Sequence, residues 1–368
     1  MAKEIVISSD SHVFEPPDLW TQRIDAKFRD RAPHMERVGD VDQLMVEGDQ
    51  MIAGIGLISN AGARFEAPET ISAQGRFDDV LTGGYDPDQH IKDMAIDGVS
   101  GEVLYPSQGL FYFKIADSEL MSAVFRAYND WLSDFCGNDP DRLKGIAMIN
   151  LDDVSDGVRE LERSARMGLV GAMISEYPWE ARRYDGAEYE PFWAAAQDLA
   201  MPLSLHVGTM RWKPGMDTSG VAVQSSVDFP NREYDARQCV YGMIFAGVFE
   251  RYPKLKVGVV EFEVAWAPYF MSRMDNFYMQ RAVGVHGYRF KGDALPSNIF
   301  IGFQEDELGI QLRHHIGVDN LLWGSDYPHA ESTFPKSREI LETILKGVPE
   351  DEKARIAGEN TAKLYVFT

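Results

Sequence analysis

Short apolar runs alternate with longer amphipathic segments along most of the chain. Continuous apolar runs are typical of strands that are buried on both faces, whereas a repeat of about 3.6 residues predicts a helix. We expect strands at residues 5–12, 99–105, 143–150, 169–175, 202–206, 256–261, 298–303 and 320–325. We expect helices at residues 88–96, 117–136, 154–167, 189–200, 232–252, 335–346 and 351–365.

The order of these segments predicts the fold class. Strands that alternate with helices indicate an α/β fold, and eight such strands close into a parallel (β/α)8 TIM barrel. An open doubly wound sheet would need a glycine-rich phosphate loop after its first strand, and none follows His12. A barrel with insertions accommodates this length, so we expect a single domain over residues 1–368.

One long stretch interrupts the alternation. Residues 14–90 are rich in Gly, Pro, Asp and Arg and show weak periodicity. A loop of this length is unusual in a compact domain unless it is functional or forms a small subdomain. We interpret it as an insertion after the first strand that covers the mouth of the barrel, with a small hairpin around Gly48-Asp49.

The amino-acid composition excludes some classes of binding partner. The chain has 368 residues and a formal net charge of −22, which disfavours nucleic acid and anionic membranes because both would be repelled. The sequence contains neither an apolar run long enough to span a bilayer nor a signal-type segment, so we expect a cytoplasmic protein. Two cysteines, Cys136 and Cys239, are too few for a disulfide framework, and we expect buried reduced thiols.

Candidate metal ligands stand where the expected strands end. Functional side chains of such a barrel collect at the carboxyl ends of its strands. Alone, each of these residues could be a turn cap, a satisfied core histidine or a solvated carboxylate. Together they predict a ring of buried charge that persists only if it is paired or binds metal. The ring comprises Asp10, His12, Glu176, His206, Glu261, Asp326 and His329.

The number and type of these ligands suggest the metal. Carboxylates with a few imidazoles suit Mn, Fe or Zn, and the absence of thiolate disfavours a structural zinc site. One catalytic ion needs about three or four protein ligands, so the surplus favours two divalent ions with Glu176 or Glu261 as the bridge. Glu261 and Glu263 share a face and compete for one inward place, and the other carboxylate could pair with an arginine.

At this point the sequence resembles a known family. The chain is similar to the amidohydrolase superfamily and, within it, to the branch called amidohydrolase 2, which includes aromatic-acid decarboxylases and lactone hydrolases. By this resemblance Asp10, His12, His206 and Asp326 match the metal ligands on strands one, five and eight. The matching segments are Asp10-Ser-His-Val-Phe-Glu-Pro-Pro-Asp-Leu-Trp20, Leu203-Ser-Leu-His206-Val-Gly, Phe249-Glu-Arg-Tyr-Pro-Lys-Leu-Lys256, Gly324-Ser-Asp-Tyr-Pro-His329 and Gly358-Glu-Asn-Thr-Ala-Lys-Leu-Tyr365.

Two departures from the branch pattern bear on the activity. The branch commonly has a His-Gly-Gly type pattern on strand six, where this chain has Glu261-Phe-Glu, and it tends to carry Phe or Tyr at the place of His329. Added carboxylate and imidazole look more like the small group of amidohydrolase-fold oxygenases that hold two metals. Our favoured hypothesis is therefore a dinuclear Fe/Fe or Mn/Fe monooxygenase that hydroxylates a C–H bond of a small, carboxylate-bearing substrate with dioxygen.

Two further hypotheses stay open. The first is a hydrolase or aromatic-acid decarboxylase, with Zn as an alternative metal and with Asp326 and His206 as catalytic residues, Asp326 carrying the proton. The second is a non-catalytic paralogue that partners an active subunit. The branch resemblance implies a homo- or hetero-oligomer of related subunits. Arg64, Arg76 or Arg211 could bind a substrate carboxylate bidentately, or could form ordinary ion pairs.

Overall fold

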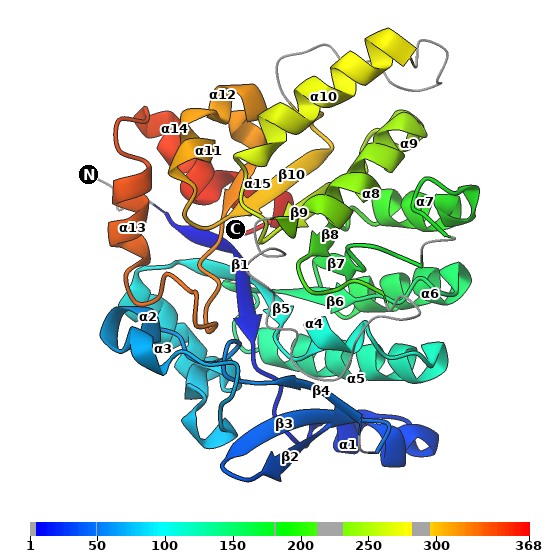
Figure 1. The fold of residues 1–368 in the computed structure, drawn as a ribbon, viewed down its shortest axis with the longest axis vertical. Coiled ribbons are helices and arrows are strands. Elements are labelled where there is room, and N and C mark those ends of the chain that lie inside the picture. The colour runs from blue at the N-terminus through cyan, green and yellow to red at the C-terminus, as the bar shows by residue number, and fades with distance from the viewer. Residues whose placement is uncertain (1–4, 49, 180–181, 212–230, 282–294) are drawn as a thin grey trace.

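Parallel strands form a nearly closed barrel with helices around it in the computed structural model, which describes residues 5–48, 50–179, 182–211, 231–281 and 295–368 (Figure 1). The strands follow one another around the barrel in chain order, which confirms the predicted (β/α)8 TIM-barrel fold. In the described residues the barrel strands are β1 (Ile7–Val13), β5 (Gly101–Pro106), β6 (Leu143–Met148), β7 (Gly171–Ile174), β8 (Leu203–His206), β9 (Val257–Val260), β10 (Ile299–Phe303) and β11 (Leu321–Trp323).

Helices on the outside of the barrel connect successive strands. Aspartates at several helix starts explain where those helices begin: Asp117 accepts the backbone N–H groups of Glu119 and Leu120, and Asp153 accepts that of Asp156. The longer helices are α3 (Pro87–Asp97), α5 (Ser118–Cys136), α6 (Val154–Arg166), α7 (Glu190–Asp198), α8 (Tyr234–Phe245), α10 (Trp266–Arg281) and α13 (Ser337–Ile344). The shorter ones are α1 (Leu19–Arg23), α2 (Ala63–Glu66), α4 (Gly109–Tyr112), α9 (Val248–Arg251), α11 (Glu307–Gln311), α12 (Arg313–Ile316), α14 (Glu350–Ala354) and α15 (Asn360–Tyr365).

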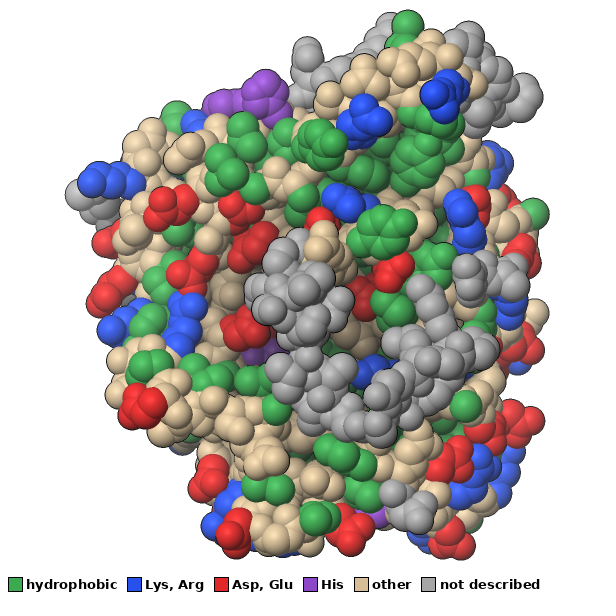
Figure 2. Space-filling view, viewed as in Figure 1, with side chains coloured by type: hydrophobic (Ala, Val, Ile, Leu, Met, Phe, Trp, Pro, Cys, Tyr) green, Lys and Arg blue, Asp and Glu red, His purple; other side chains and the backbone are tan. Residues whose placement is uncertain are grey.

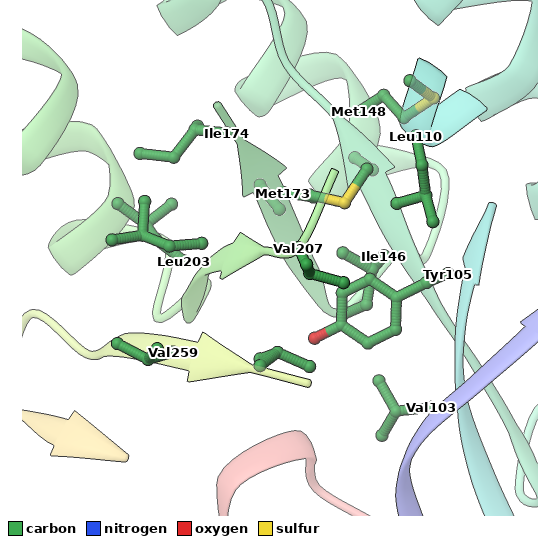
Figure 3. Packing of buried hydrophobic residues seen from close by; sticks show 14 of the residues in the cluster. Val103, Tyr105, Leu110, Ile146, Met148, Met173, Ile174, Leu203, Val207 and Val259 are labelled. Atoms are coloured by element: carbon green, nitrogen blue, oxygen red, sulfur yellow. The ribbon is translucent and has the colours of Figure 1, made fainter. Parts of the chain in front are cut away.

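The interior of the barrel is filled with side chains. Figure 3 shows Tyr105, Met173 and Val207 among the residues that neighbouring strands direct into this space. The hydroxyl of Tyr105 lies 2.7 Å from Oγ of Ser204, so this buried polar atom has a partner. The core is therefore packed, and chemistry is confined to the ends of the strands.

The first and last strands meet through the segment that follows β11. The backbone N–H of Asp326 donates to the carbonyl of Asp10 at 2.8 Å, and the N–H of His12 donates to the carbonyl of Tyr327 at 2.5 Å. The N–H of Ser325 donates to Oγ of Ser8 at 2.9 Å. These bonds close the barrel at the place where the candidate ligands of β1 and of the last strand stand.

The long insertion contains a small sheet of its own. Its strands are β2 (His34–Val38), β3 (Val41–Val46) and β4 (Gln50–Gly54), which pair antiparallel in the order β2-β3-β4. The predicted hairpin around Gly48 corresponds to the pair β3–β4, while the sequence pattern does not predict β2. Elsewhere the insertion contacts the segment after β11, because the N–H of Ala61 donates to the carbonyl of Pro328.

Two helical segments differ from the sequence prediction. The helix expected over residues 232–252 is split into α8 and α9 because Gly247 adopts a left-handed conformation with φ of +71°. Helix α10 is absent from the predicted helices. Exposed Tyr269, Phe277 and Met279 stand among exposed polar residues such as Arg273 and Asn276, so apolar and polar positions do not separate into two clear faces along the sequence.

Two further expectations can be compared with the described residues. Cys136 lies in α5 and Cys239 in α8, and both are buried and free of disulfide bonds, as predicted. No helix in the described part of the chain combines the length and the apolar character that crossing a membrane requires.

Closure of the barrel generates a stability prediction at Gly324. A Cβ atom at this position would stand 2.5 Å from Cβ of Asp10 and 3.1 Å from its backbone N and O. Because backbone cannot move aside locally, we expect Gly324→Ala to lower the free energy of unfolding by about 1–3 kcal/mol, as overpacking does in cores. Urea denaturation followed by circular dichroism would measure the change.

Gly302 on the neighbouring strand β10 provides the matched control. A Cβ atom there would meet Val260 at 3.4 Å, an ordinary contact. Gly302→Ala should keep the wild-type stability or gain up to about 1 kcal/mol through the lower entropy of the unfolded chain. Equal losses in both variants would contradict the role assigned to Gly324.

Candidate metal centre

Strand β1 contributes two candidate ligands, Asp10 and His12. The ladder between β1 and β5 changes register between Ser8 and Ser11, so the strand is irregular where Asp10 stands. Both side chains face the barrel interior: Asp10 is 4% exposed and His12 is fully buried. The strand therefore places a carboxylate and an imidazole next to each other, both buried away from solvent.

A first group of ligand atoms surrounds His206, the last residue of β8. Nε2 of His206 lies 3.3 Å from Oδ1 of Asp10 and 3.5 Å from Oε2 of Glu261, which follows β9. Nε2 of His12 lies 3.4 Å from the same oxygen of Asp10. Asp10, His12, His206 and Glu261 each offer one ligand atom, and these atoms lie within 4.8 Å of one another.

A second group overlaps the first on the side of β11. Oδ1 of Asp326 lies 3.3 Å from Nε2 of His12 and 2.8 Å from Nδ1 of His329. The rings of His12 and His329 stack with centroids 3.8 Å apart. His12, Glu261, Asp326 and His329 again place one ligand atom each within 4.8 Å of one another. Six of the seven residues predicted from the sequence thus gather at one place.

Hydrogen bonds behind the ring orient two of its histidines. Nδ1 of His12 lies 2.9 Å from the carbonyl of Pro106, and Nδ1 of His206 lies 3.0 Å from the carbonyl of Val207. Because a carbonyl can only accept, each Nδ1 carries the proton. In the neutral rings the lone pair is then on Nε2, which faces the centre of the group, as is usual for metal-ligating histidines.

Several atoms of the ring are buried without a hydrogen bond of acceptable geometry. They include Nε2 of His12, Oε2 of Glu261 and Oδ1 of Asp326. A buried polar atom without a partner destabilises the fold by about 1–3 kcal/mol, and more when it is charged. A cation placed among these atoms would satisfy all three, so the residues present fit a divalent metal.

The acid–base properties of the ring point the same way. Burial would raise the pKa of Asp10, but His206 and His12 outweigh it and hold that pKa below its usual range. Burial and the nearby Asp326 raise the pKa of Glu261 well above its usual range. These carboxylates cannot all ionise together without additional positive charge.

Burial also opposes protonation of the two stacked histidines, with different outcomes. For His12 the neighbouring Asp10 and Asp326 outweigh burial and raise its pKa well above the ordinary value. For His329 burial prevails over Asp326, and its pKa is lowered. The surroundings therefore favour a proton on His12 more than on His329, although the two rings lie in contact.

Glu176 differs from the sequence prediction, because it lies outside both groups of ligand atoms found among the described residues. It follows β7 and is buried. The backbone N–H groups of Gly208 and Met210 donate hydrogen bonds to its carboxylate, which lowers its pKa. Burial, with nearby Asp235, raises its pKa to about 8. The chain turns this carboxyl group toward the backbone after β8 rather than toward the ring.

The competition between Glu261 and Glu263 is resolved by the backbone. Both residues have positive φ, +66° and +53°, which is uncommon for glutamate. Glu261 reaches the ring, whereas Glu263 accepts the N–H groups of Gln304 and Glu305 at 3.2 and 3.3 Å. The arginine partner expected for the outer carboxylate lies instead beside the inner one, because Nη1 of Arg232 is 3.8 Å from Oε1 of Glu261.

Two neighbours of the ring escape the sequence prediction. Ser107, the residue after β5, places its Oγ 3.0 Å from Nε2 of His329. Arg232 stands close before α8 and brings positive charge to Glu261. Ser107 closely follows a predicted strand, so its place at the carboxyl end of the barrel could be inferred from the sequence. Its residue type gives no sign that it contacts a metal ligand.

Each of the three arginines considered for substrate binding has a carboxylate partner within the chain. Arg64 pairs with Glu305, and Arg76 pairs with Asp78 at 2.7 Å. Arg211 is buried and pairs with Asp152 at 2.6 Å while its Nη1 donates to the carbonyl of Ile115 at 2.8 Å. The ion-pair alternative describes all three in this structure.

The ring lies at the mouth of the barrel. Figure 2 shows acidic and histidine side chains inside a central hollow of the face that is viewed down the shortest axis. A small molecule reaching the ring would approach from this face.

Comparison with known proteins identifies the family. The family model described as Amidohydrolase matches residues 102–367, which is most of the chain. Gamma-resorcylate decarboxylase of Polaromonas sp. strain JS666 is 26% identical over 270 residues, covering 68% of this chain and 78% of that protein.

Solved structures share the fold over the whole chain. An amidohydrolase from Mycobacterium avium subsp. paratuberculosis superposes with a TM-score of 0.78 at 22% identity, covering 99% of this chain and 100% of the other. A dihydroxybenzoic acid decarboxylase from Polaromonas sp. JS666, with bound manganese and the inhibitor 2-nitroresorcinol, gives 0.65 at 19% identity, covering 99% and 97%. From the family match over residues 102–367, the chain belongs to the amidohydrolase family.

Proposed function

We propose that this protein is a metal-dependent decarboxylase of small aromatic acids. The observation that carries the proposal is the buried ring. Ligand atoms of Asp10, His12, His206 and Glu261 converge there, Asp326 joins through His12 at 3.3 Å, and several of these atoms lack hydrogen bonds. The similarity to gamma-resorcylate decarboxylase and to a manganese-containing dihydroxybenzoic acid decarboxylase supports this activity over hydrolysis.

Asp10, His12, His206 and Asp326 would hold one divalent ion, with Glu261 beside it. The donor set of carboxylates and imidazoles suits Mn and also Zn or Fe, and no cysteine belongs to either ligand group in the described residues. When bound, such an ion supplies a Lewis acid that holds and polarises an anionic oxygen of the substrate.

The remaining chemistry is a proton transfer, for which Asp326 and His329 are placed. Decarboxylation breaks the bond between the aromatic ring of the substrate and its carboxylate group. It releases carbon dioxide and places a proton on the aromatic carbon that held the carboxylate. Oδ1 of Asp326 is 2.8 Å from Nδ1 of His329, whose Nε2 is held by Ser107. This chain of contacts orients Asp326 as the group that carries the proton.

Burial contributes by excluding water from the reacting groups. His12 and His206 are fully buried, and Asp326 is 3% exposed. In such surroundings fixed charges act more strongly than in water. The carbonyl of Val207 holds the ring of His206 in one orientation. His206 would therefore serve as a metal ligand and as a rigid side chain that lines the site.

A second candidate function is the dinuclear oxygenase favoured by the sequence. The observation that favours it is the presence of two overlapping groups of four ligands, both of which contain Glu261. Two ions, Fe and/or Mn, would then share Glu261 and support hydroxylation with dioxygen. The relatives named above support the decarboxylase and give no support to this alternative.

Metal analysis of two matched variants tests the ligand set. We expect Glu261→Gln to lower the metal content or affinity at least roughly tenfold, as loss of a group at a metal site does. Glu176→Gln makes the same change in another buried carboxyl group, which lies outside the ligand groups. It should keep the wild-type metal content when measured by plasma mass spectrometry.

The same measurement separates the two functions. One metal per chain supports the decarboxylase, whereas two redox-active ions together with substrate-dependent oxygen uptake would support the oxygenase. Loss of metal in Glu176→Gln but not in Glu261→Gln would contradict the assignment of ligands.

An activity measurement tests the proton carrier. The manganese-loaded protein should release carbon dioxide from dihydroxybenzoic or other hydroxylated aromatic acids, and a chelator should abolish the release. Asp326→Asn should lower kcat by roughly 10²–10⁴-fold, the usual range for loss of general acid–base catalysis. Metal content must be measured in parallel, because Asp326 is also a proposed ligand.

Ser107→Ala separates positioning from ligation in this site. It leaves every proposed ligand in place and removes only the contact with Nε2 of His329. We expect normal metal content with a lower kcat and an unchanged KM. An unchanged kcat would remove Ser107 and His329 from the mechanism, and no turnover of any aromatic acid by wild type would refute the decarboxylase.

A further inference from the structure

Helix α3 packs against the outside of the barrel with polar side chains. His90, Asp93 and Asp97 are buried, and their spacing of three and four residues places them on one side of the helix. The buried side of a helix is usually apolar, because a polar group taken out of water is unfavourable unless it forms a hydrogen bond. Each of these three side chains therefore needs a partner inside the protein.

The partner of Asp93 is Tyr327, the residue that follows Asp326. The hydroxyl of Tyr327 donates to Oδ2 of Asp93 at 2.6 Å, while Oδ1 accepts from Nε2 of Gln89 at 2.8 Å. A hydrogen bond to an ionised carboxylate is stronger than one between neutral groups. Tyr327 is 2% exposed, so little water competes for this contact. Asp93 thus reaches from α3 to the segment after β11, which carries two residues of the ring.

The surroundings of the tyrosine are shaped to admit this hydrogen bond. A Cβ atom at Gly83 would stand 2.1 Å from Oδ2 of Asp93 and 2.3 Å from the hydroxyl of Tyr327, so a glycine is needed there. The ring of His90 meets that of Tyr327 edge-on with centroids 5.2 Å apart. His90 is itself fixed, because its Nδ1 lies 2.7 Å from the carbonyl of Gly83 and its Nε2 lies 2.6 Å from Glu102 on β5.

Helix α3 also holds the far end of the same segment. Asp97 accepts the backbone N–H of Ser337 at 2.9 Å, and Oγ of Ser337 lies 2.6 Å from Oγ1 of Thr333. The N–H of Thr333 donates to the carbonyl of Ser325 at 2.9 Å, which ties the two ends of the segment together. Figure 1 shows α3 and α13 on the same side of the barrel, where these contacts form.

The backbone of Asp326 explains why the segment needs such support. Its φ is +61°, a left-handed conformation that is unfavourable for residues with a Cβ atom. A conformation of this kind persists only where the surrounding structure enforces it. Backbone hydrogen bonds with Asp10 and His12 hold Asp326 and Tyr327 from the side of the barrel. The hydroxyl of Tyr327 is held from the opposite side, by α3.

We propose that Asp93 is a positioning residue for the metal centre. Its carboxylate holds the hydroxyl of Tyr327, and Tyr327 keeps Asp326 in the left-handed conformation. In this conformation Oδ1 of Asp326 lies 3.3 Å from Nε2 of His12 and 2.8 Å from Nδ1 of His329. The inference rests on the proposed function only where it concerns turnover, since the bound metal reports the geometry of Asp326 without any substrate.

A role in stability alone does not account for polar groups at this place. Buried charged or hydrogen-bonded groups can often be replaced by apolar residues of similar volume without loss of stability. Apolar contacts have no preferred direction, whereas a hydrogen bond fixes the distance and angle between its atoms. The contact of Asp93 with Tyr327 therefore supplies orientation, which is the property that a ligand in an unfavourable backbone conformation requires.

Electron paramagnetic resonance of the manganese-loaded protein tests the proposal. Tyr327→Phe removes only the hydroxyl and should change the spectrum of the bound Mn(II), because Asp326 is then less well fixed. We expect manganese affinity and kcat for dihydroxybenzoic acid to fall roughly tenfold, the lower end of the range for loss of an outer contact of a metal site. KM should stay unchanged. Asp93→Ala should act alike, and the double variant should be no worse than either single one.

Two further variants separate positioning from folding. Asp93→Asn keeps an oxygen that accepts from Tyr327, and the amide of Gln89 can turn to accept from the new NH₂ group. It should therefore restore most of the spectrum and of kcat relative to Asp93→Ala. Gly83→Ala keeps both partners but forces them apart, and it should reproduce the effect of Tyr327→Phe.

Tyr189→Phe is the matched control. Tyr189 is 1% exposed and donates its hydroxyl to the carbonyl of Arg182 at 2.7 Å, outside both ligand groups. Its loss should lower the thermal unfolding temperature but leave the Mn(II) spectrum and kcat as in the wild type.

A wild-type spectrum, manganese affinity and kcat in Tyr327→Phe or Asp93→Ala would overturn the proposal, whatever the loss of stability. Equal spectral changes in Tyr189→Phe would do the same. If the wild type binds manganese but releases no carbon dioxide from any aromatic acid, the proposed function fails, and the spectra of the variants still decide the role of Asp93.

Discussion

Repulsion between buried carboxylates is the constraint on which the rest of the site depends. Asp10, Glu261 and Asp326 hold their oxygens close together with little access to water, and the histidines between them supply only part of the opposing charge. Buried like charges are strongly unfavourable unless a cation or proton compensates them. The fold therefore maintains a site whose electrostatic balance is completed by a ligand, which is the property expected of a metal centre.

The barrel is predictable because its strands are short apolar runs, most of which are followed by an amphipathic segment with helical period. The same regularity predicts that Asp10, His12, His206, Glu261, and the pair Asp326 and His329 gather at one end of the barrel. The end of a predicted strand indicates where a residue lies along the barrel axis. It does not indicate the direction in which the side chain points. This is why Glu176, also at a strand end, is predicted within the ring although its carboxyl group turns to the backbone after β8.

What the sequence leaves open depends on contacts between distant segments. The choice between Glu261 and Glu263 is made by backbone conformation and by the N–H groups of Gln304 and Glu305, which follow a different strand. Helix α10 is not predicted because exposed apolar residues such as Tyr269 and Met279 are mixed with its exposed polar residues and weaken the helical period. Local sequence patterns do not predict the direction of a side chain when that direction depends on a partner far along the chain.

Closure of the barrel through the residues beside Asp10 and Asp326 also has a consequence for biosynthesis. The two segments that bond to each other are separated by more than three hundred positions, as in the contact of Ser8 with Ser325. A nascent chain therefore displays Asp10 and His12 long before Asp326 leaves the ribosome. A ligand that contacts both segments can therefore bind only after nearly the whole barrel has been translated.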